Sequence, residues 1–350
     1  MSVHAFTSFS FSYLNRARVL ARTLRDHHPD WTIWAVVTDI CPQAAALDWT
    51  EEDFDRVLFP ADLFGDTAEP WLFAHNVVEA CTAVKGAAAC HILDQADCDK
   101  LMYFDPDIAV FNALTPVVDL LDSHSIILTP HQTAPAGRSE RQNIMDNELS
   151  SLMHGTYNLG FIAFSDTEEG RRCTSWWDER LRDWCHDRKD IGVFVDQKWC
   201  DLIPCFFDNV KILRDPGYNV ASWNLSHRTL VLDDAGQIRV NGHPLRFFHF
   251  TKLGPQGDAM TQRYAAGNTE VFELWFWYKA QIENATDPRI PKGYWHYGTF
   301  DNDTPIPDTV RRLYRDRKDL RAAFKNPRQV EDGFFAWLHA ETDLMHGGAG

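Results

Sequence analysis

Two aspartates separated by one proline, Asp105 and Asp107, directly follow a short apolar segment at residues 101–104. Carboxylates at this spacing on a turn can both reach one hard cation, and Mn²⁺ or Mg²⁺ prefers such oxygen ligands together with substrate phosphates. A surface turn is the simpler interpretation, because Asp and Pro are common turn residues. The apolar strand before the motif favours a ligand site, since ligands of open α/β sheets bind beyond the carboxyl ends of strands.

A histidine within the aromatic residues 247–250 is the second candidate. Taken alone, His249 is more simply a core histidine that has found a hydrogen-bond partner. Joined to the two aspartates it would complete a three-ligand metal site, because imidazole also suits Mn²⁺.

Two further pairs could bind a sugar. Asp196 and Gln197 offer a carboxylate and an amide at the predicted start of a helix, where a helix cap is the competing interpretation. Asn158 offers both a donor and an acceptor, and Gly160 would let a ligand approach the backbone. An ordinary strand with a bulge is the alternative for this second pair.

The elements that must position these residues follow an α/β pattern. Strands are predicted at residues 4–9, 31–37, 101–104, 125–129, 157–164 and 245–250, with a hairpin at 230–241. Helices are predicted at 13–26, 77–93, 168–189 and 271–282, and a mostly charged helix at 309–338. The polar segment 131–151 is predicted as a long loop, interpreted as part of an acceptor site and as a lid.

Composition narrows the classes of function. The 350 residues carry a formal net charge of −16, which argues against broad nucleic-acid binding. No apolar run is long enough to span a membrane, and the first residues lack the pattern of a secretory signal. Eight cysteines without a Cys-x-x-Cys pair are interpreted as buried free thiols of a cytoplasmic protein. The arginines of residues 309–338 are interpreted as a solvated face, with contact to anionic lipid at the inner membrane face as the alternative.

In their order along the chain, these motifs resemble the GT-A glycosyltransferases, most closely glycosyltransferase family 8 and related bacterial enzymes. The likeness spans about residues 3 to 255 and depends on the ordered set. The motifs are Tyr13-Leu14, Lys85, Tyr103-Phe104-Asp105-Pro106-Asp107-Ile108, Tyr157-Asn158-Leu159-Gly160, Asp196-Gln197, Gly217-Tyr218-Asn219, Trp223-Asn224 and His249-Phe250-Thr251-Lys252.

This resemblance implies a Rossmann-like GT-A domain over residues 1–256 and a mostly helical extension over 257–350. It implies Mn²⁺ or Mg²⁺ held by Asp105, Asp107 and His249, with Asp196 and Gln197 as catalytic residues near the anomeric carbon. The donor-binding residues that it implies are Thr7, Ser8, Tyr13, Lys85, Asn158, Gly160, Asn219 and Lys252.

The implied activity is transfer of a sugar from a nucleoside-diphosphate sugar, with a UDP-sugar favoured, to a hydroxyl of a saccharide or other acceptor. Retention of anomeric configuration is also implied. Family members often carry an acid shortly after the first strand that helps to bind uracil, and residues 7–11 contain none, so the base stays open. Lys252 stands third after His249, where the family often has glycine, which leaves the role of Lys252 open.

Three other classes compete. A sugar nucleotidyltransferase would need a glycine-rich basic loop after the first strand, and residues 7–16 contain no glycine. A phosphatase of the haloacid-dehalogenase type normally has Thr or Val two residues after its second aspartate, where Ala109 stands here. A non-catalytic protein that binds nucleotide-sugars on the same fold is the third alternative.

Overall fold

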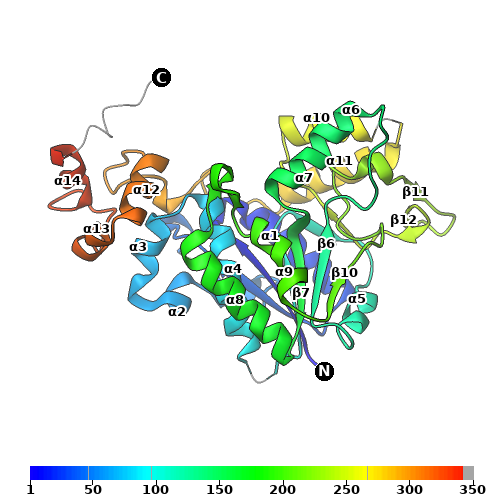
Figure 1. The fold of residues 1–350 in the computed structure, drawn as a ribbon, viewed down its shortest axis with the longest axis horizontal. Helices are drawn as coiled ribbons and strands as arrows, with labels where there is room; N and C mark the ends of the chain where they lie inside the picture. Colours follow the sequence, from blue (N-terminus) through cyan, green and yellow to red (C-terminus); the bar gives the residue numbers. More distant parts are fainter. Residues whose placement is uncertain (46, 96, 266, 342–350) are drawn as a thin grey trace.

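The computed structural model describes residues 1–45, 47–95, 97–265 and 267–341. A seven-stranded sheet in the order β10-β6-β7-β4-β1-β2-β3 forms its centre (Figure 1). Only β7 runs against its neighbours, pairing antiparallel with both β4 and β6. The strands of this sheet are β1 (Val3–Phe9), β2 (Thr32–Val37), β3 (Arg56–Leu58), β4 (Lys100–Phe104), β6 (Ile126–Pro130), β7 (Tyr157–Ser165) and β10 (Val210–Ile212).

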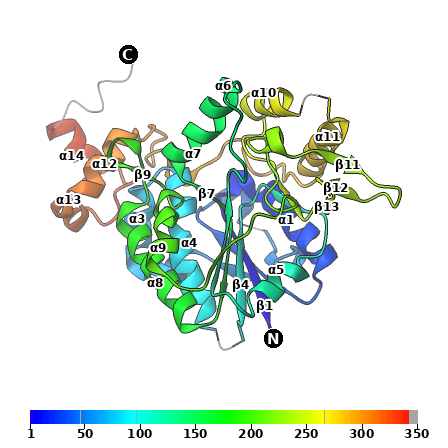
Figure 2. The ribbon, with the colours of Figure 1, turned by 45° about the vertical axis from the view of Figure 1, so that its right-hand side comes forward.

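Helices cover both faces of the sheet, as Figure 2 shows. One core cluster joins α1 (Leu14–His27) and α5 (Thr115–Leu120) to one face, and a second joins α4 (Val77–Leu93) and α8 (Glu168–Trp184) to the other. The central strands are therefore apolar on both sides, and every residue of β1 and β7 is buried.

Three small sheets complete the strand content: β5 (Ile108–Val110) with β14 (Phe247–His249), β8 (Asp187–Arg188) with β9 (Val193–Phe194), and β11 (Leu230–Leu232), β12 (Ile238–Val240) and β13 (His243–Pro244). The other helices are α2 (Pro60–Phe64), α3 (Ala68–Phe73), α6 (Arg141–Asn143), α7 (Leu149–His154), α9 (Ile203–Phe206), α10 (Pro255–Tyr264), α11 (Thr269–Asn284), α12 (Asp308–Asp316), α13 (Lys318–Ala323) and α14 (Phe334–Glu341).

The predicted α/β class with a mostly helical C-terminal part is confirmed. Helix α11 shares a core with β14 and the residue after it, through the contacts of Phe248 with Trp275 and of Phe250 with Tyr278. Helices α12 to α14 form another cluster with α3, around Phe73, Tyr314 and Phe334. The C-terminal residues thus pack on the sheet domain at two places, while the division at residue 256 stays a prediction.

Three predicted elements were wrong in extent. The helix predicted at 309–338 is three helices, because Arg317 is extended, with φ −100° and ψ 96°, and Pro327 and Gly333 interrupt the chain further on. The helix predicted at 168–189 ends at Trp184, since Asp187 and Arg188 pair with β9. The polar segment 131–151 is helical from Arg141 through a π-helical turn, Ile144–Glu148, into α7.

Most of the cysteines lie inside, as predicted. Cys41, Cys98, Cys173, Cys185 and Cys200 are buried, and all eight thiols are free. Among the described residues, no helix combines the length and the apolar character that crossing a membrane requires.

One glycine fixes how closely the two helices on one face approach. A Cβ at Gly86 of α4 would lie 2.5 Å from the Cα and 2.6 Å from the backbone N of Asp178 in α8. Because these are backbone atoms, a side chain at position 86 would push α8 away from the sheet.

We therefore expect Gly86→Ala to lower the free energy of unfolding by about 1–3 kcal/mol, the usual cost of overpacking. The gain of about 1 kcal/mol in helix propensity opposes this loss and does not remove the clash. Chemical denaturation measures the change. Gly137→Ala is the matched control, since its Cβ would meet first the end of the Glu140 side chain, at 3.1 Å; a shift within about 0.5 kcal/mol is expected there. Equal effects of the two variants would contradict the close approach of α4 and α8.

Candidate metal centre and its surroundings

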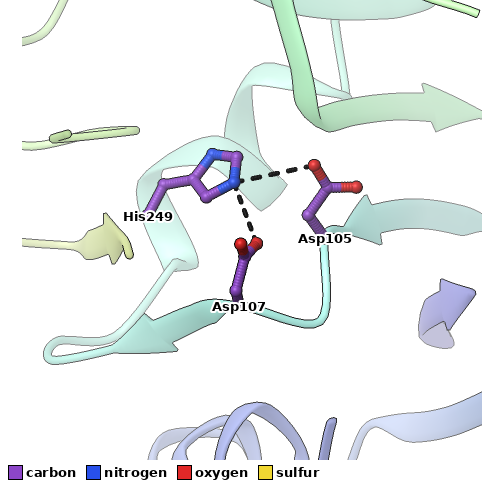
Figure 3. Close-up of side chains that lie close together, drawn as sticks. All are labelled: Asp105, Asp107 and His249. Atoms are coloured by element: carbon purple, nitrogen blue, oxygen red, sulfur yellow. Dashed lines mark ion pairs between the residues drawn. The ribbon is translucent and has the colours of Figure 1, made fainter. Parts of the chain in front are cut away.

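Asp105 and Asp107 flank the turn from β4 to β5, and β14 brings His249 beside that turn (Figure 3). His249 Nε2 lies 3.6 Å from Asp105 Oδ2 and 2.9 Å from Asp107 Oδ1. One ligand atom from each residue lies within 4.8 Å of the others. Two carboxylates and one imidazole at these separations suit a single divalent cation of the Mn²⁺ or Mg²⁺ type.

The charges of this cluster are strongly interdependent. Burial alone raises the pKa of Asp107, but the adjacent His249 outweighs burial and the pKa is lowered. Burial alone lowers the pKa of His249, but the charges of Asp107 and Asp105 outweigh it and the pKa is raised. The carboxylates therefore require a nearby positive charge, which a proton on His249 or a divalent cation can supply.

Asn158 and Gly160 on β7 contact this histidine directly. Asn158 Oδ1 lies 3.2 Å from His249 Nδ1 and also accepts from Gly160 N at 3.1 Å and from Asn219 Nδ2 at 3.0 Å. A proton held on Nδ1 leaves Nε2 directed at the two aspartates, as metal-binding histidines require. A Cβ at Gly160 would lie 2.4 Å from His249 Cε1, so the absence of a side chain at 160 makes room for the ring.

A buried lysine joins the metal cluster to the second predicted pair. Lys85 Nζ donates to Asp105 Oδ1 at 3.2 Å, to Asp196 Oδ2 at 2.7 Å and to the Leu159 carbonyl at 3.1 Å. Burial opposes the charge of Lys85, yet the two carboxylates raise its pKa well above the ordinary value. Burial raises the pKa of Asp196, whose side chain is 2% exposed. One cation thus connects the carboxylate at 105 with the carboxylate at 196.

Gln197 and Asn219 lie in the same hydrogen-bonded group. Gln197 Oε1 accepts from Leu159 N at 3.2 Å, and its Nε2 donates to the His154 carbonyl at 3.1 Å. Asn219, which has a φ of 50°, also donates to Thr129 Oγ1 at 2.8 Å. Its own Oδ1 is buried without a hydrogen-bond partner.

Of the other predicted donor-binding residues, some lie near the cluster and some do not. Ser8 reaches the cluster through Tyr103, whereas Thr7 is buried in β1 and its hydroxyl has no hydrogen-bond partner. Tyr13 is 38% exposed, and Asp107 contributes, after burial, to raising its pKa. Lys252 is exposed on a turn with a φ of 53°, and the structure does not bring it into the cluster.

Two residues of this region were not selected from the sequence. Tyr103 donates to Asp105 Oδ1 at 2.6 Å and shares a hydrogen bond with Ser8 Oγ at 3.1 Å. The Lys85 ammonium also lies over the Tyr103 ring, 4.1 Å from the ring centroid, in a cation–π contact. In the sequence, Tyr103 is one residue of the apolar strand at 101–104, and only the structure reveals that its hydroxyl supports Asp105.

The second is Asp39 at the end of β2. Its carboxylate accepts from the backbone N–H groups of Phe11, Ile40 and His296 at 3.3, 2.9 and 2.9 Å. It therefore joins the turn after β1 to the C-terminal part of the chain. Burial raises its pKa to about 7, although these three N–H groups act in the opposite direction.

We expect Gly160→Ala to weaken Mn²⁺ binding by about 10- to 100-fold, as is usual when the support of a metal-binding histidine is lost. The added methyl group displaces the His249 ring, and metal titration calorimetry measures the loss. Gly298→Ala is the control, since a Cβ there would make only ordinary contact, 3.5 Å from Trp295 Cδ1. Unchanged Mn²⁺ affinity in Gly160→Ala would remove His249 from the metal site.

Asp39 should make stability depend on pH. Because its folded pKa of about 7 exceeds the ordinary aspartate value of 3.8, the folded protein binds more protons and stability falls as pH rises between these values. Asp39→Asn should flatten this part of the profile, measured as the difference in unfolding free energy between variant and wild type from pH 4 to 8. A difference that does not change with pH would contradict the assignment.

No protein-family model matches this chain. The uncharacterized protein YfnF of Bacillus subtilis (strain 168) is 29% identical over 154 residues, which is 44% of this chain and 49% of YfnF. YfnD of the same organism is 24% identical over 176 residues, 49% of this chain and 53% of YfnD. The chain spans about half the length of the curated relatives it matches.

Solved structures of glycosyltransferases resemble the chain over most of its length. The galactosyltransferase LgtC in complex with donor and acceptor sugar analogs is 19% identical, with 79% of this chain and 95% of that chain covered and a TM-score of 0.45. GlyE of Streptococcus pneumoniae TIGR4 is 16% identical over 83% and 65% of the two chains, with a TM-score of 0.44. Mouse xyloside xylosyltransferase 1 is 16% identical over 73% and 99%, with a TM-score of 0.42. At these identities and TM-scores the likeness transfers no activity, and function must be argued from the residues of the site.

Proposed function

We propose that this protein is a glycosyltransferase that moves a sugar from a nucleoside-diphosphate sugar to an acceptor hydroxyl. The observation that carries the proposal is the continuity of the site. Lys85 links Asp105 of the three-ligand cluster to Asp196, so that a place for a diphosphate-bound cation and a place for a sugar adjoin each other. The α/β architecture, with the site at the carboxyl end of β4, supports the same proposal.

Asp105, Asp107 and His249 would hold Mn²⁺ or Mg²⁺. The bound ion would supply Lewis-acid stabilisation of the negative charge that develops on the departing nucleoside diphosphate. The chain's own contribution is to orient the ligands. Tyr103 and Lys85 occupy Asp105 Oδ1, which leaves Oδ2 on the side of His249, and Asn158 holds the imidazole from behind.

The transferred sugar is placed at Asp196 and Gln197 by this proposal. Lys85 fixes one carboxylate oxygen of Asp196, and Gln197 is held by the β7 backbone at Leu159 and by the end of α7. These contacts pre-organise the two side chains before a sugar arrives. No side chain among them stands out as a nucleophile toward an anomeric carbon, so we propose attack on the face from which the diphosphate departs, with retention of configuration.

A pocket of about 500 Å³ supports a place for the nucleoside, because the charge of its lining residue Arg16 acts on Asp107 of the cluster. One wall is the turn after β1 with Phe11, Tyr13 and Arg16, and the other is the C-terminal segment that includes Ile290 and Lys292. The Arg16 guanidinium lies 4.1 Å from the centre of the Tyr13 ring, and its charge helps to lower the pKa of Asp107, after the larger effects of burial and His249. An aromatic surface with nearby cations suits a base and its phosphates. UDP stays the favoured carrier, and the base is open to experiment.

Asp105→Asn and Asp107→Asn test the proposal. We expect Mn²⁺-dependent hydrolysis of the cognate donor and transfer to fall by at least about 100-fold, because charge stabilisation of the leaving group is lost. A panel of nucleoside-diphosphate sugars, first screened by thermal shift with and without Mn²⁺, identifies the donor. Asp234→Asn, on the exposed turn between β11 and β12, is the control and should keep full activity.

The outcomes separate the competing functions. Full activity of Asp105→Asn and Asp107→Asn in the presence of a chelator would refute metal dependence. Metal-dependent donor binding without hydrolysis or transfer to any acceptor would instead identify a nucleotide-sugar-binding protein. Release of phosphate from simple phosphate esters, without any sugar transfer, would favour a phosphohydrolase.

A further inference from the structure

A second, smaller cavity lies away from the metal centre, where α12 meets the beginning of α4 and strand β8. Its volume is about 160 Å³. The lining residues are Asn76, Glu79, Asp187, Arg188, Asp308, Arg311, Arg312 and Arg315. None of them belongs to the metal cluster or to the proposed donor site.

Some of these charges are already matched by neighbours outside the cavity. Arg188 pairs with Asp190 at 2.7 Å, and Asp187 pairs with Lys189 at 2.7 Å. These two pairs account for one arginine and one acid of the lining. Three arginines of α12 and two acids, Glu79 and Asp308, remain among the lining residues, and Arg315 also lies 3.5 Å from Asp316 outside the cavity.

Arg311 is 4% exposed, and its guanidinium is only partly satisfied. Its two terminal nitrogens donate to the carbonyls of Phe73, His75 and Tyr297. Its Nε has no hydrogen-bond partner, and Asp308 Oδ1 stands 3.9 Å away. A buried N–H of a cation without an acceptor is costly, which indicates a missing partner.

The other two arginines are also available. Arg315 Nη1 lies 2.9 Å from His186 Nδ1 and 3.7 Å from Glu79 Oε2, and its Nε lies 3.5 Å from Asp316 Oδ1, so its contacts with acids are loose. Arg312 is exposed, and no acid of the described chain stands within ion-pair distance of it. Burial lowers the pKa of Arg311 to about 10, which agrees with the missing partner of its Nε.

We propose that this cavity binds an oxyanion of the phosphate class, either inorganic phosphate or the phosphate of a monoester, through Arg311, Arg312 and Arg315. Guanidinium groups donate in a planar fork that matches phosphate oxygens. The cavity has roughly ten times the free space of about 10–15 Å³ that one water needs, which is room enough for a phosphate group.

Such an anion would brace parts of the chain that lead to the proposed sugar site. Strand β8 leads through β9 to Asp196, and α4 carries Lys85 six residues beyond Glu79. Bound phosphate would therefore tie α12 of the C-terminal part to both elements. This inference does not depend on the proposed sugar transfer, because the cavity shares no residue with that site.

Phosphate binding can be measured on the full chain by thermal shift and calorimetry in EDTA, with sodium chloride at equal ionic strength as reference. We expect phosphate to raise the melting temperature above the chloride value, and Arg312→Gln and Arg315→Gln each to weaken its affinity by about ten-fold, the loss of one charge-assisted hydrogen bond. Arg317→Gln, an exposed arginine that pairs with Asp319, is the matched control and should bind as wild type. Asp107→Asn should also retain binding, which separates this cavity from the metal site.

Arms with inorganic phosphate, glycerol 3-phosphate and sulfate distinguish a free anion from a monoester. If Arg315→Gln fails to fold, the exposed Arg312 still provides the test. An equal effect of phosphate and chloride, or equal phosphate affinity in wild type and Arg312→Gln, would overturn the proposal.

Discussion

The structure around the site depends on compensating the negative charge of three carboxylates that are largely buried. Asp107 and Asp196 are almost fully buried, and Asp105 is partly so. Burial of unpaired charges would cost several kcal/mol each. Lys85 lies between Asp105 and Asp196, and His249 lies between Asp105 and Asp107. An imidazole that binds a metal is neutral, so the single charge of Lys85 is then shared among three acids. Two negative charges remain for a divalent cation next to His249 Nε2.

The antiparallel strand β7 is what brings the supporting groups to this point. Because Phe104 pairs with Phe161, the backbone of Gly160 stands opposite Asp105, and Asp105 N donates to the Gly160 carbonyl at 2.8 Å. Asn158 and Leu159 then lie at the same edge, where they meet His249, Lys85 and Gln197. The beginning of β7 thus contacts His249, Lys85 and Gln197. Because every residue of β7 is buried, a shift of its pairing by one residue would disrupt the core, and the position of these contacts is fixed.

The sequence predicted the α/β class, five of the seven central strands and the three candidate metal ligands that the structure brings together, because apolar periodicity and short acidic motifs are local signals. The short edge strands β3 and β10 were missed, since three residues give too little of a periodic signal. It did not predict that Asn158 and Gly160 would contact the histidine, since a contact between β7 and β14 depends on tertiary register. The hydrogen bond from Tyr103 to Asp105 was missed for the same reason, because an aromatic residue in an apolar strand is typical of the core. The break at Arg317 was missed because the charged pattern continues across it, whereas the packing of Tyr314 and Phe334 on Phe73 requires the chain to bend.

The three hydrogen bonds that converge on the Asn158 side-chain oxygen have an evolutionary consequence. One oxygen serves the Gly160 backbone, the Asn219 amide and the His249 ring, although an amide oxygen has only two lone pairs. A substitution at one of these positions would disturb the hydrogen bonds of the others. Among diverging relatives, positions 158, 160, 219 and 249 should therefore be inherited as one block, kept together where the metal chemistry persists and lost together where it has been abandoned.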